Sequence, residues 1–191
     1  ASGLPATVGT CRLILPARRG AGAFAASELF ALGPLLASHP DLVFCEVGRA
    51  CVAASHRRQG VVEALWRGLW VFSRRHGVDV LFGAASFPGT DPRRHAQTIA
   101  ALTSAPPPPG WEVLPRPEVA AALPAIREAS DRDAVLRALP PLIRGYLHLG
   151  ALFSGGAAID RGFGTTDLLV MTRLACVPKR YRDHFARVTG I

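Results

Sequence analysis

The chain is short of lysine, of aromatic residues and of long apolar runs. It contains one lysine against 21 arginines, and Phe, Trp and Tyr together make up 7% of its 191 residues. These few aromatic residues are not interleaved with basic ones, which argues against a stacking platform for single-stranded nucleic acid. Without the roughly 20 consecutive apolar residues of a spanning helix or the pattern of a signal peptide, we expect no membrane span and no secretion.

Cysteine is also scarce and irregularly placed. The four cysteines, Cys11, Cys45, Cys51 and Cys176, show no C-x-x-C spacing. A zinc site or a disulfide framework is therefore not expected, and the sequence predicts no bound metal. A reducing, cytoplasmic location fits this usage best.

What the chain does have is apolar residues and positive charge. Hydrophobic residues make up 49% of it, enough for a sizeable core, and its length suits a single domain over residues 1–191. The formal net charge of +8 favours acidic partners. Candidates are a phosphorylated cofactor, an acidic carrier protein or an anionic membrane face, and the scarcity of aromatic residues disfavours nucleic acid.

Strand-like and helix-like segments alternate along the chain. Helical spacing of apolar residues predicts helices over 61–76 and 179–189, and Asp91 followed by Pro92 is typical of a helix start. Shorter helices are expected within 28–36 and 118–139. Strands are expected over 7–15, 42–52, 78–86, 151–159 and 167–174. The alternation predicts an α/β or α+β fold in which helices flank one central mixed sheet.

A basic loop joins the predicted strand 42–52 to the predicted helix 61–76. It contains Arg57, Arg58, Gln59, Gly60 and Val61. The first amides of a helix are unpaired and lie at the positive end of its dipole, so they attract anions. We therefore interpret these five residues as a binding site for a cofactor phosphate. A solvated basic turn with an ordinary helix start is the alternative.

Two charged residues interrupt the apolar strand before this loop. Glu46 and Arg49 would face opposite sides of a regular strand. Gly48 between them suggests a β-bulge, which would turn both side chains towards one face and open a slot beside the strand. A buried carboxylate needs a partner or a function. Glu46 is thus a candidate general base, and Arg49 a candidate partner for Glu46 or for a substrate carboxylate. A purely structural ion pair is the alternative.

These residues carry a family resemblance. The loop is similar to the R-x-x-G-x-G/A loop of the GNAT acyltransferases, although Val62 stands where Gly or Ala is usual. The segment EVGRACV at 46–52 resembles the ELGRSCV segment of the ornithine N-acyltransferases, which use acyl carrier protein as donor. Three further segments resemble that family in the same order, namely 79–92, 139–151 and 160–168.

The resemblance implies a GNAT-like fold and a specific reaction. A fatty acyl group, often 3-hydroxylated, would pass from acyl carrier protein to the α-amine of ornithine, giving lyso-ornithine lipid. The donor's acyl-phosphopantetheine would be a co-substrate, and no permanently bound cofactor is implied. Members usually carry several dozen residues before Thr7, so we expect the first strand and helices of the fold to be missing. An acyl-CoA-dependent or acyl-homoserine-lactone-synthase-like enzyme and a non-catalytic lipid-binding module are the alternatives.

Three further expectations concern the substrate and the surroundings. Ser86, Thr90, Asp91 and His95 follow the predicted strand 78–86, where ligands of α/β proteins often bind, and are candidate substrate contacts. Alternatively, Asp91 only caps the helix and His95 lies on the surface. Arg144, Tyr146 and His148 are candidate contacts for acyl carrier protein or the acyl chain, and a half-buried strand or helix face is the alternative. A basic protein that makes a lipid is expected to bind the inner membrane face peripherally.

Overall fold

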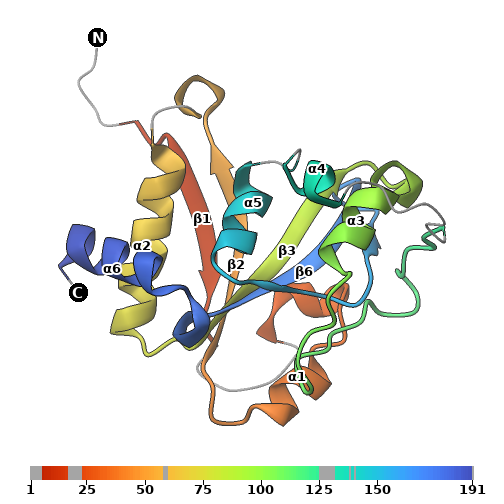
Figure 1. Cartoon of the computed structure of the whole chain (residues 1–191), viewed down its shortest axis with the longest axis horizontal. Helices are drawn as coiled ribbons and strands as arrows, with labels where there is room; N and C mark the ends of the chain where they lie inside the picture. The colour runs from red at the N-terminus through yellow and green to blue at the C-terminus, as the bar shows by residue number, and fades with distance from the viewer. Residues whose placement is uncertain are drawn as a thin grey trace.

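The chain folds around a mixed sheet of six strands, as a computed structural model shows (Figure 1). The structure describes residues 6–16, 23–57, 60–124, 132–137, 139 and 141–190. The strands are β1 (Gly9–Ile14), β2 (Phe44–Val52), β3 (Val80–Pro88), β4 (Leu152–Phe153), β5 (Ala158–Asp160) and β6 (Thr165–Arg173). Their order is β1-β2-β3-β6-β4, and β4 and β5 pair with successive parts of β6. β2 and β3 run parallel, whereas the other pairs are antiparallel.

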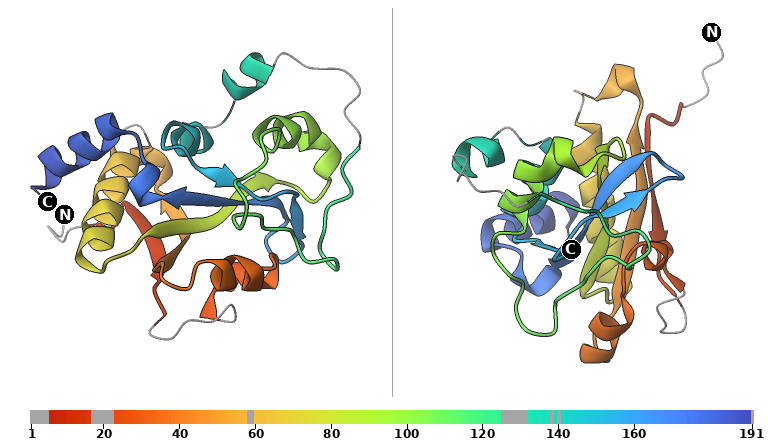
Figure 2. Two further views of the ribbon diagram at one scale, coloured as in Figure 1. Left: turned by 60° about the horizontal axis from the view of Figure 1, so that its bottom comes forward. Right: turned by 90° about the vertical axis from the view of Figure 1, so that its right-hand side faces the viewer.

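Helices cover both faces of this sheet (Figure 2). The 3-10 helix η2 (Ala25–Glu28) and α1 (Gly33–Ser38) pack on one face, together with the loop that carries Trp111 and Val113. The opposite face carries α2 (Val61–Arg75), α3 (Ala96–Leu102), α5 (Pro141–His148) and α6 (Lys179–Thr189). The short helix α4 (Arg132–Arg137) contacts α3. We call these two surfaces of the sheet the η2 face and the α2 face.

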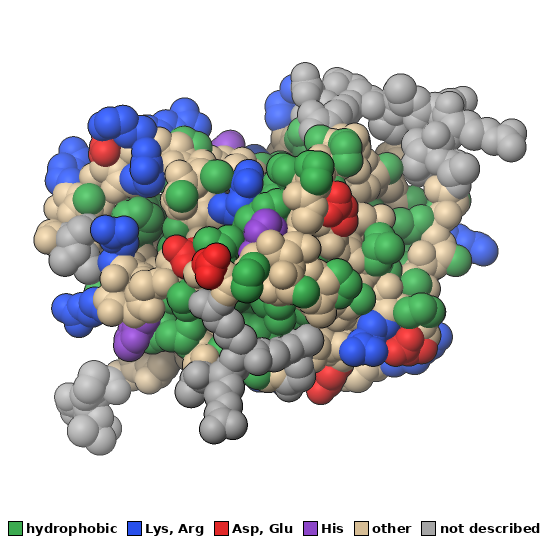
Figure 3. All heavy atoms as spheres, turned by 90° about the horizontal axis from the view of Figure 1, so that it is seen from below, with side chains coloured by type: hydrophobic (Ala, Val, Ile, Leu, Met, Phe, Trp, Pro, Cys, Tyr) green, Lys and Arg blue, Asp and Glu red, His purple; other side chains and the backbone are tan. Residues whose placement is uncertain are grey.

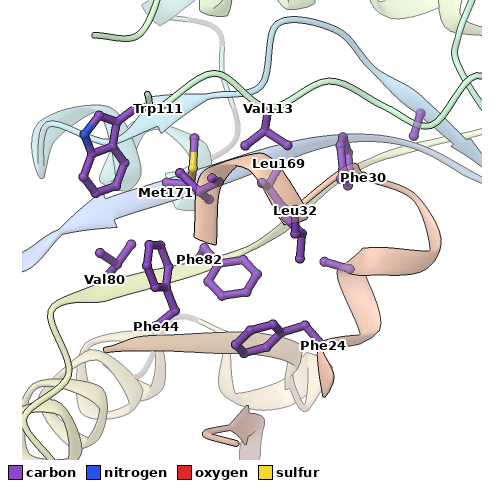
Figure 4. Close-up of a cluster of buried hydrophobic side chains, with 13 residues drawn as sticks. Phe24, Phe30, Leu32, Phe44, Val80, Phe82, Trp111, Val113, Leu169 and Met171 are labelled. Atoms are coloured by element: carbon purple, nitrogen blue, oxygen red, sulfur yellow. The ribbon is translucent and has the colours of Figure 1, made fainter. Parts of the chain in front are cut away.

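The core on the η2 face is rich in aromatic side chains (Figure 4). The Phe24 ring lies edge-on to that of Phe82, with the two centroids 4.9 Å apart. Phe44 contacts Phe82 in the same manner at 6.2 Å. Such edge-to-face pairs stabilise a core by about 0.5–1.5 kcal/mol beyond the area they bury. They fix η2 over the parallel strands β2 and β3.

Helix α2 follows directly from its sequence. Gly60 precedes it in the left-handed conformation, with φ of 70°, and the apolar stripe of α2 places Leu69 in the core against the sheet. After the helix ends at Arg75, Gly77 again takes a positive φ of 61°. The predicted helix 61–76 and its glycine stop are confirmed, because periodicity and glycine placement are local signals.

The parallel strands β2 and β3 separate midway. Their ladder covers only residues 44–46 and 80–82, and its last pair is Glu46 with Phe82. Just beyond that pair, Gly83 lies so close to Val47 that a Cβ atom would sit 2.1 Å from the Val47 carbonyl oxygen. The divergence therefore starts at a backbone contact that only glycine permits.

A β-bulge accompanies this separation, as predicted. In the β1–β2 register Arg12 faces Gly48 and Thr10 faces Cys51, so β2 has one extra residue. Arg49 occupies the bulge with a positive φ of 53°. The left-handed position thus belongs to Arg49, whereas the sequence pointed to its neighbour Gly48.

The remaining predictions agree with the structure in outline. Strands, and the basic helix α6, form in the predicted segments. The short helices expected near 28–36 form as η2 and α1. Two segments are more broken than expected. The strand expected over 151–159 is divided into β4 and β5, and the helix expected over 91–102 begins as the 3-10 helix η4 (Pro92–His95) before α3. No helix in the described part of the chain is long and apolar enough to span a membrane.

Candidate functional site

An apolar pocket of about 690 Å³ opens on the α2 face, where β2 and β3 part. Val47, Phe82 and Gly83 line it at the start of the separation. α2 contributes Trp66, and α5 contributes Tyr146. This volume falls within the range of small-molecule sites and suits a long hydrocarbon better than a polar ligand. The pocket reaches the strand position beside Glu46, since Phe82 is its partner in the ladder.

Tyr146 brings a phenol hydroxyl into this mostly apolar lining. Its ring packs edge-on against Trp66, with the centroids 5.5 Å apart. Burial raises the pKa of Tyr146 to about 12. The phenol is consequently neutral at physiological pH and can donate a hydrogen bond to a polar group on a bound chain.

The predicted phosphate loop borders the pocket. Arg57 lines it, is exposed, and donates from Nε to the Val52 carbonyl oxygen at 3.4 Å. Gly60 and Val61 form the start of α2, so the unpaired amides of this helix begin beside the pocket. Arg58 and Gln59, the other two predicted members, lie outside the described residues. An anionic group entering here would meet the Arg57 guanidinium and the helix start together.

Glu46 lies on the η2 face and is 4% exposed. Its Oε2 accepts a hydrogen bond from the Ala26 backbone N–H at 3.3 Å, and its Oε1 lies 3.6 Å from Nη2 of Arg12. A Cβ atom on Gly48 would lie only 3.3 Å from Nη2 of Arg12, and it would make an ordinary contact with Oε1 of Glu46 at 3.8 Å. The carboxylate is thus held in one place between η2 and β1, on the opposite face from the apolar pocket.

Arg49 does not take the role of partner to Glu46. The ion pair that the structure gives Glu46 is with Arg12, a β1 residue that the sequence did not indicate. Arg49 is exposed and its guanidinium lies over the Phe163 ring, 4.3 Å from the centroid. The left-handed backbone of the bulge redirects its side chain towards the turn before β6. The expected Glu46–Arg49 pair is therefore corrected, whereas a contact between Arg49 and a substrate stays a prediction.

The structure places the four predicted substrate contacts in different surroundings. Ser86 is exposed on the η2 face of β3, opposite Asp167 of β6. Asp91 accepts a hydrogen bond from the Arg93 N–H at 3.1 Å, which is an ordinary helix cap. Nε2 of His95 lies 2.9 Å from the Pro88 carbonyl oxygen, and the His95 ring packs on Phe87. Thr90 lies in the loop between β3 and η4 and is exposed. The structure brings only Ser86 onto the face that carries Glu46.

Asp167 and Arg12 are the polar groups that sequence reasoning missed. Asp167 is 2% exposed, and burial raises its pKa although the hydroxyls of Ser86 and Thr165 act in the opposite direction. The sequence did offer a signal for Asp167, because it is an acidic residue in an apolar strand, as Glu46 is. Arg12 gave none, because a single arginine in an edge strand such as β1 is usually solvated.

The two faces together make a site that suits acyl transfer. The apolar pocket on the α2 face can hold a chain, and Arg57 with the start of α2 can hold an anionic group. Glu46 lies on the η2 face, in the last pair of the β2–β3 ladder, and its partner Phe82 lines the pocket. Among the described residues, no group of three or more His, Cys, Asp or Glu side chains is placed to hold a metal ion.

Comparison with known proteins first places the chain in a class. Residues 2–67, which include Glu46 and the loop at 57–61, match the family described as "Acetyltransferase (GNAT) domain". With a mixed sheet flanked by helices, the chain has the GNAT fold, as expected. No solved structure matches it significantly.

Curated relatives narrow this class. The chain is 40% identical over 187 residues to "L-ornithine N(alpha)-acyltransferase" of Rhizobium meliloti (strain 1021), covering 96% of this chain and 63% of that protein. Proteins of the same name from Agrobacterium fabrum and Brucella abortus are 38% and 37% identical, with 93% of this chain covered and 62% and 64% of theirs. The resemblance to the ornithine N-acyltransferases is confirmed. The chain spans somewhat less than two thirds of the length of these relatives.

Proposed function

We propose that the chain is an N-acyltransferase that moves a fatty acyl group, with 3-hydroxyacyl as the expected type, from acyl carrier protein to the α-amine of ornithine. The observation that carries this proposal is the place where β2 and β3 separate, because there the apolar pocket is lined by Val47 and Phe82, the chain neighbour and the ladder partner of Glu46. The name shared by the relatives, L-ornithine N(alpha)-acyltransferase, supports the choice of acceptor. The product would be lyso-ornithine lipid.

The reaction needs a neutral amine and a positioned thioester. Glu46 takes one proton from the substrate ammonium, directly or through water, and the free amine attacks the thioester carbonyl. A carbon–nitrogen bond forms and the carbon–sulfur bond breaks. The second amine proton goes to the departing thiolate, so amide, thiol and one released proton balance the equation. Backbone N–H groups freed where β2 leaves β3 are suitable donors for the oxyanion.

The donor would lie along the α2 face. Its acyl chain occupies the apolar pocket, where the Tyr146 hydroxyl can meet a polar substituent on the chain. Its phosphate lies at the loop that contains Arg57 and Gly60. No covalent enzyme intermediate is required, because both substrates can be bound together from opposite faces.

Detection of the product tests the proposal. The protein, expressed from its complete open reading frame, is incubated with ornithine and 3-hydroxyacyl-loaded acyl carrier protein, and N-acylated ornithine is sought by mass spectrometry. Turnover with acyl-CoA but not with the carrier would replace the proposed donor. Donor binding without any acylated amine would indicate a non-catalytic binding module instead.

Removing charge from the phosphate loop should weaken donor binding. We expect Arg57→Ala combined with Arg58→Ala to raise the Kd for the acyl donor about tenfold at low salt, since charge-assisted hydrogen bonds are lost. The effect should shrink at high salt, where the charges are already screened. The matched control is Arg74→Ala with Arg75→Ala, which removes two exposed arginines from the other end of α2. Equal losses in both double variants would show a general charge effect and remove the loop from the site.

We also infer peripheral attachment to an anionic membrane face, within a cytoplasmic location. Lys and Arg side chains gather at the end of the molecule that carries α2 and α6 (Figure 3). Lys179, Arg180, Arg182 and Arg187 of α6 are all exposed. Acyl carrier protein is acidic, so the same surface suits the proposed donor.

Vesicle binding tests this attachment. Replacing Arg180 and Arg182 with Ala should lower the partition onto anionic vesicles about 10- to 30-fold, because each basic residue near the surface contributes about 1 kcal/mol. Arg93→Ala with Arg94→Ala, on η4, is the matched control and should change it little. Moderate salt should release the bound protein. Retention on vesicles at high salt would show apolar insertion and contradict the electrostatic account.

A further inference from the structure

Polar atoms without partners gather on the η2 face of the sheet. In the described part of the chain, Asp167 Oδ1 and Arg12 Nε are buried without a hydrogen-bond partner, and Thr165 Oγ1, although close enough to act on the Asp167 pKa, makes no hydrogen bond of ordinary geometry. A buried polar atom left unpaired costs about 1–3 kcal/mol, and native proteins contain few of them. Two of the three belong to neighbouring positions on one side of β6, and the third belongs to the residue that pairs with Glu46.

The sheet register places these groups on the same side as Glu46. Glu46 pairs with Phe82, Phe82 with Met171, and Ser86 with Asp167. Paired residues share a face, and so do residues two or four apart on one strand. Ser86 and Ala84 are both exposed, so this face of β3 is open to solvent beside Asp167. A ligand lying there would meet Glu46 and Asp167 from the same side.

The Asp167 carboxyl and the two hydroxyls beside it are suited to bind a cation. Asp167 forms no ion pair with any residue that the structure describes, and the acidic Asp160 raises its pKa further. Burial also raises the Asp167 pKa, as expected for a carboxyl without a cationic partner. A primary ammonium carries the missing charge and three N–H donors, which matches one carboxylate and the hydroxyls of Ser86 and Thr165.

We propose that Asp167, with Ser86 and Thr165, binds the side-chain ammonium of the acceptor amino acid. This inference rests on the proposed function, in which Glu46 receives the α-amine. Asp167 is then the residue that selects a diamino acid over a neutral amino acid of the same length. A site built to pair a buried charge rejects an analogue that lacks the counter-charge.

The dimensions agree with one molecule that meets Asp167 directly and Glu46 through a water molecule. Strand rise and spacing put the Cα atoms of Glu46 and Asp167 about 16 Å apart. An extended ornithine has about 6 Å between its two nitrogens, and two hydrogen bonds of about 2.9 Å extend its reach to about 12 Å between acceptor oxygens. Arg12 and the Ala26 N–H hold the Glu46 carboxylate on the side of β1. The Asp167 side chain and one water molecule between the α-amine and Glu46 must therefore close the remaining distance, as in the water-mediated proton transfer proposed above.

Calorimetric binding tests the subsite without requiring turnover. The ligands are ornithine and 2-aminopentanoate, which is ornithine without its terminal amine. We expect the wild type to bind ornithine about 10- to 100-fold more tightly than the analogue. In Asp167→Asn the two affinities should become equal within about threefold. Asp160→Asn, the matched control, removes the neighbouring acid and should keep the preference. An undiminished preference in Asp167→Asn would overturn the proposal.

Turnover separates this inference from the proposed function. If neither acceptor is acylated but ornithine binds in an Asp167-dependent manner, the proposed function fails and the ammonium subsite holds. If ornithine is acylated with the same preference over 2-aminopentanoate in wild type and Asp167→Asn, the subsite fails and the proposed function holds. Ser86→Ala is a second variant, for which we expect a preference reduced about three- to tenfold; an unchanged preference there counts against the subsite.

The Tm of Asp167→Asn shows whether a lost preference for ornithine comes from damage to the fold. The Asp167 pKa is higher in the folded protein than in the unfolded chain. Its ionisation therefore lowers the stability of the fold as pH rises from the unfolded pKa through the folded one. Asparagine removes this cost, so the Tm of the variant at pH 7 should equal or exceed that of the wild type. A lower Tm would mean that Asp167 is structural, and would overturn the proposal.

Discussion

Replacing Glu46 with glutamine should lower kcat/KM for acyl transfer by about two to four orders of magnitude, the usual loss when a general base is removed. Glutamine keeps the shape of the side chain and can still accept the Ala26 N–H through its amide oxygen. It cannot accept a proton from the ammonium substrate. The fold should therefore persist, with donor affinity unchanged, while the chemical step slows. The measurement is steady-state turnover of ornithine with a saturating acyl donor.

Arg12→Met is the informative control for this variant. This variant breaks the ion pair by removing the Arg12 guanidinium, and it leaves the Glu46 carboxylate in place. If the pair were only structural, both variants would lose the same activity and the same stability. Under the proposed mechanism Glu46→Gln loses far more activity than Arg12→Met. A folded Glu46→Gln protein that turns over at the wild-type rate would rule out Glu46 as the base.

Gly83→Ala adds a single methyl group, and we expect it to destabilise the protein strongly. The added Cβ would lie 2.1 Å from the Val47 carbonyl oxygen, so either β2 or β3 must move. Overpacking of this kind costs about 1–3 kcal/mol, which corresponds to a fall in Tm of about 2–12 °C in a domain of this length. Because the displaced backbone borders the apolar pocket and Glu46, turnover should fall as well. Thermal unfolding followed by circular dichroism measures the first effect.

Gly68→Ala provides the matched substitution. Gly68 lies inside α2, and a Cβ added there meets nothing within 4 Å. Alanine should stabilise the helix by about 0.5–1 kcal/mol, so the same chemical change has opposite signs at the two glycines. A similar Tm for the two variants would show that β2 and β3 do not approach closely at Gly83.

Local patterns predicted much of this fold, whereas contacts between distant segments needed the structure. Helix α2 and its glycine stop follow from apolar spacing, and Gly48 indicated the bulge in β2. The sequence did not show that Arg49 occupies the left-handed position, because this depends on register with β1 and on Phe163 from a remote turn. It identified Glu46 but gave the wrong partner, since Arg12 meets it only through the β1–β2 pairing. Ser86 was found, but Asp167 opposite it was given no role at the start of the predicted strand 167–174.

The separation of β2 from β3 also has a consequence for how a product could leave. In the proposed reaction the new amide forms in the gap between the strands, with the hydrocarbon tail on one side of the sheet and the amino-acid head on the other. Such a molecule is threaded through the protein. It cannot depart by simply backing out of either substrate's entrance, because one of its two ends would have to cross the gap. The easier exit is sideways, along the open ends of the strands. Release would then be slower than the entry of either substrate, and an anionic bilayer able to receive the tail should accelerate it.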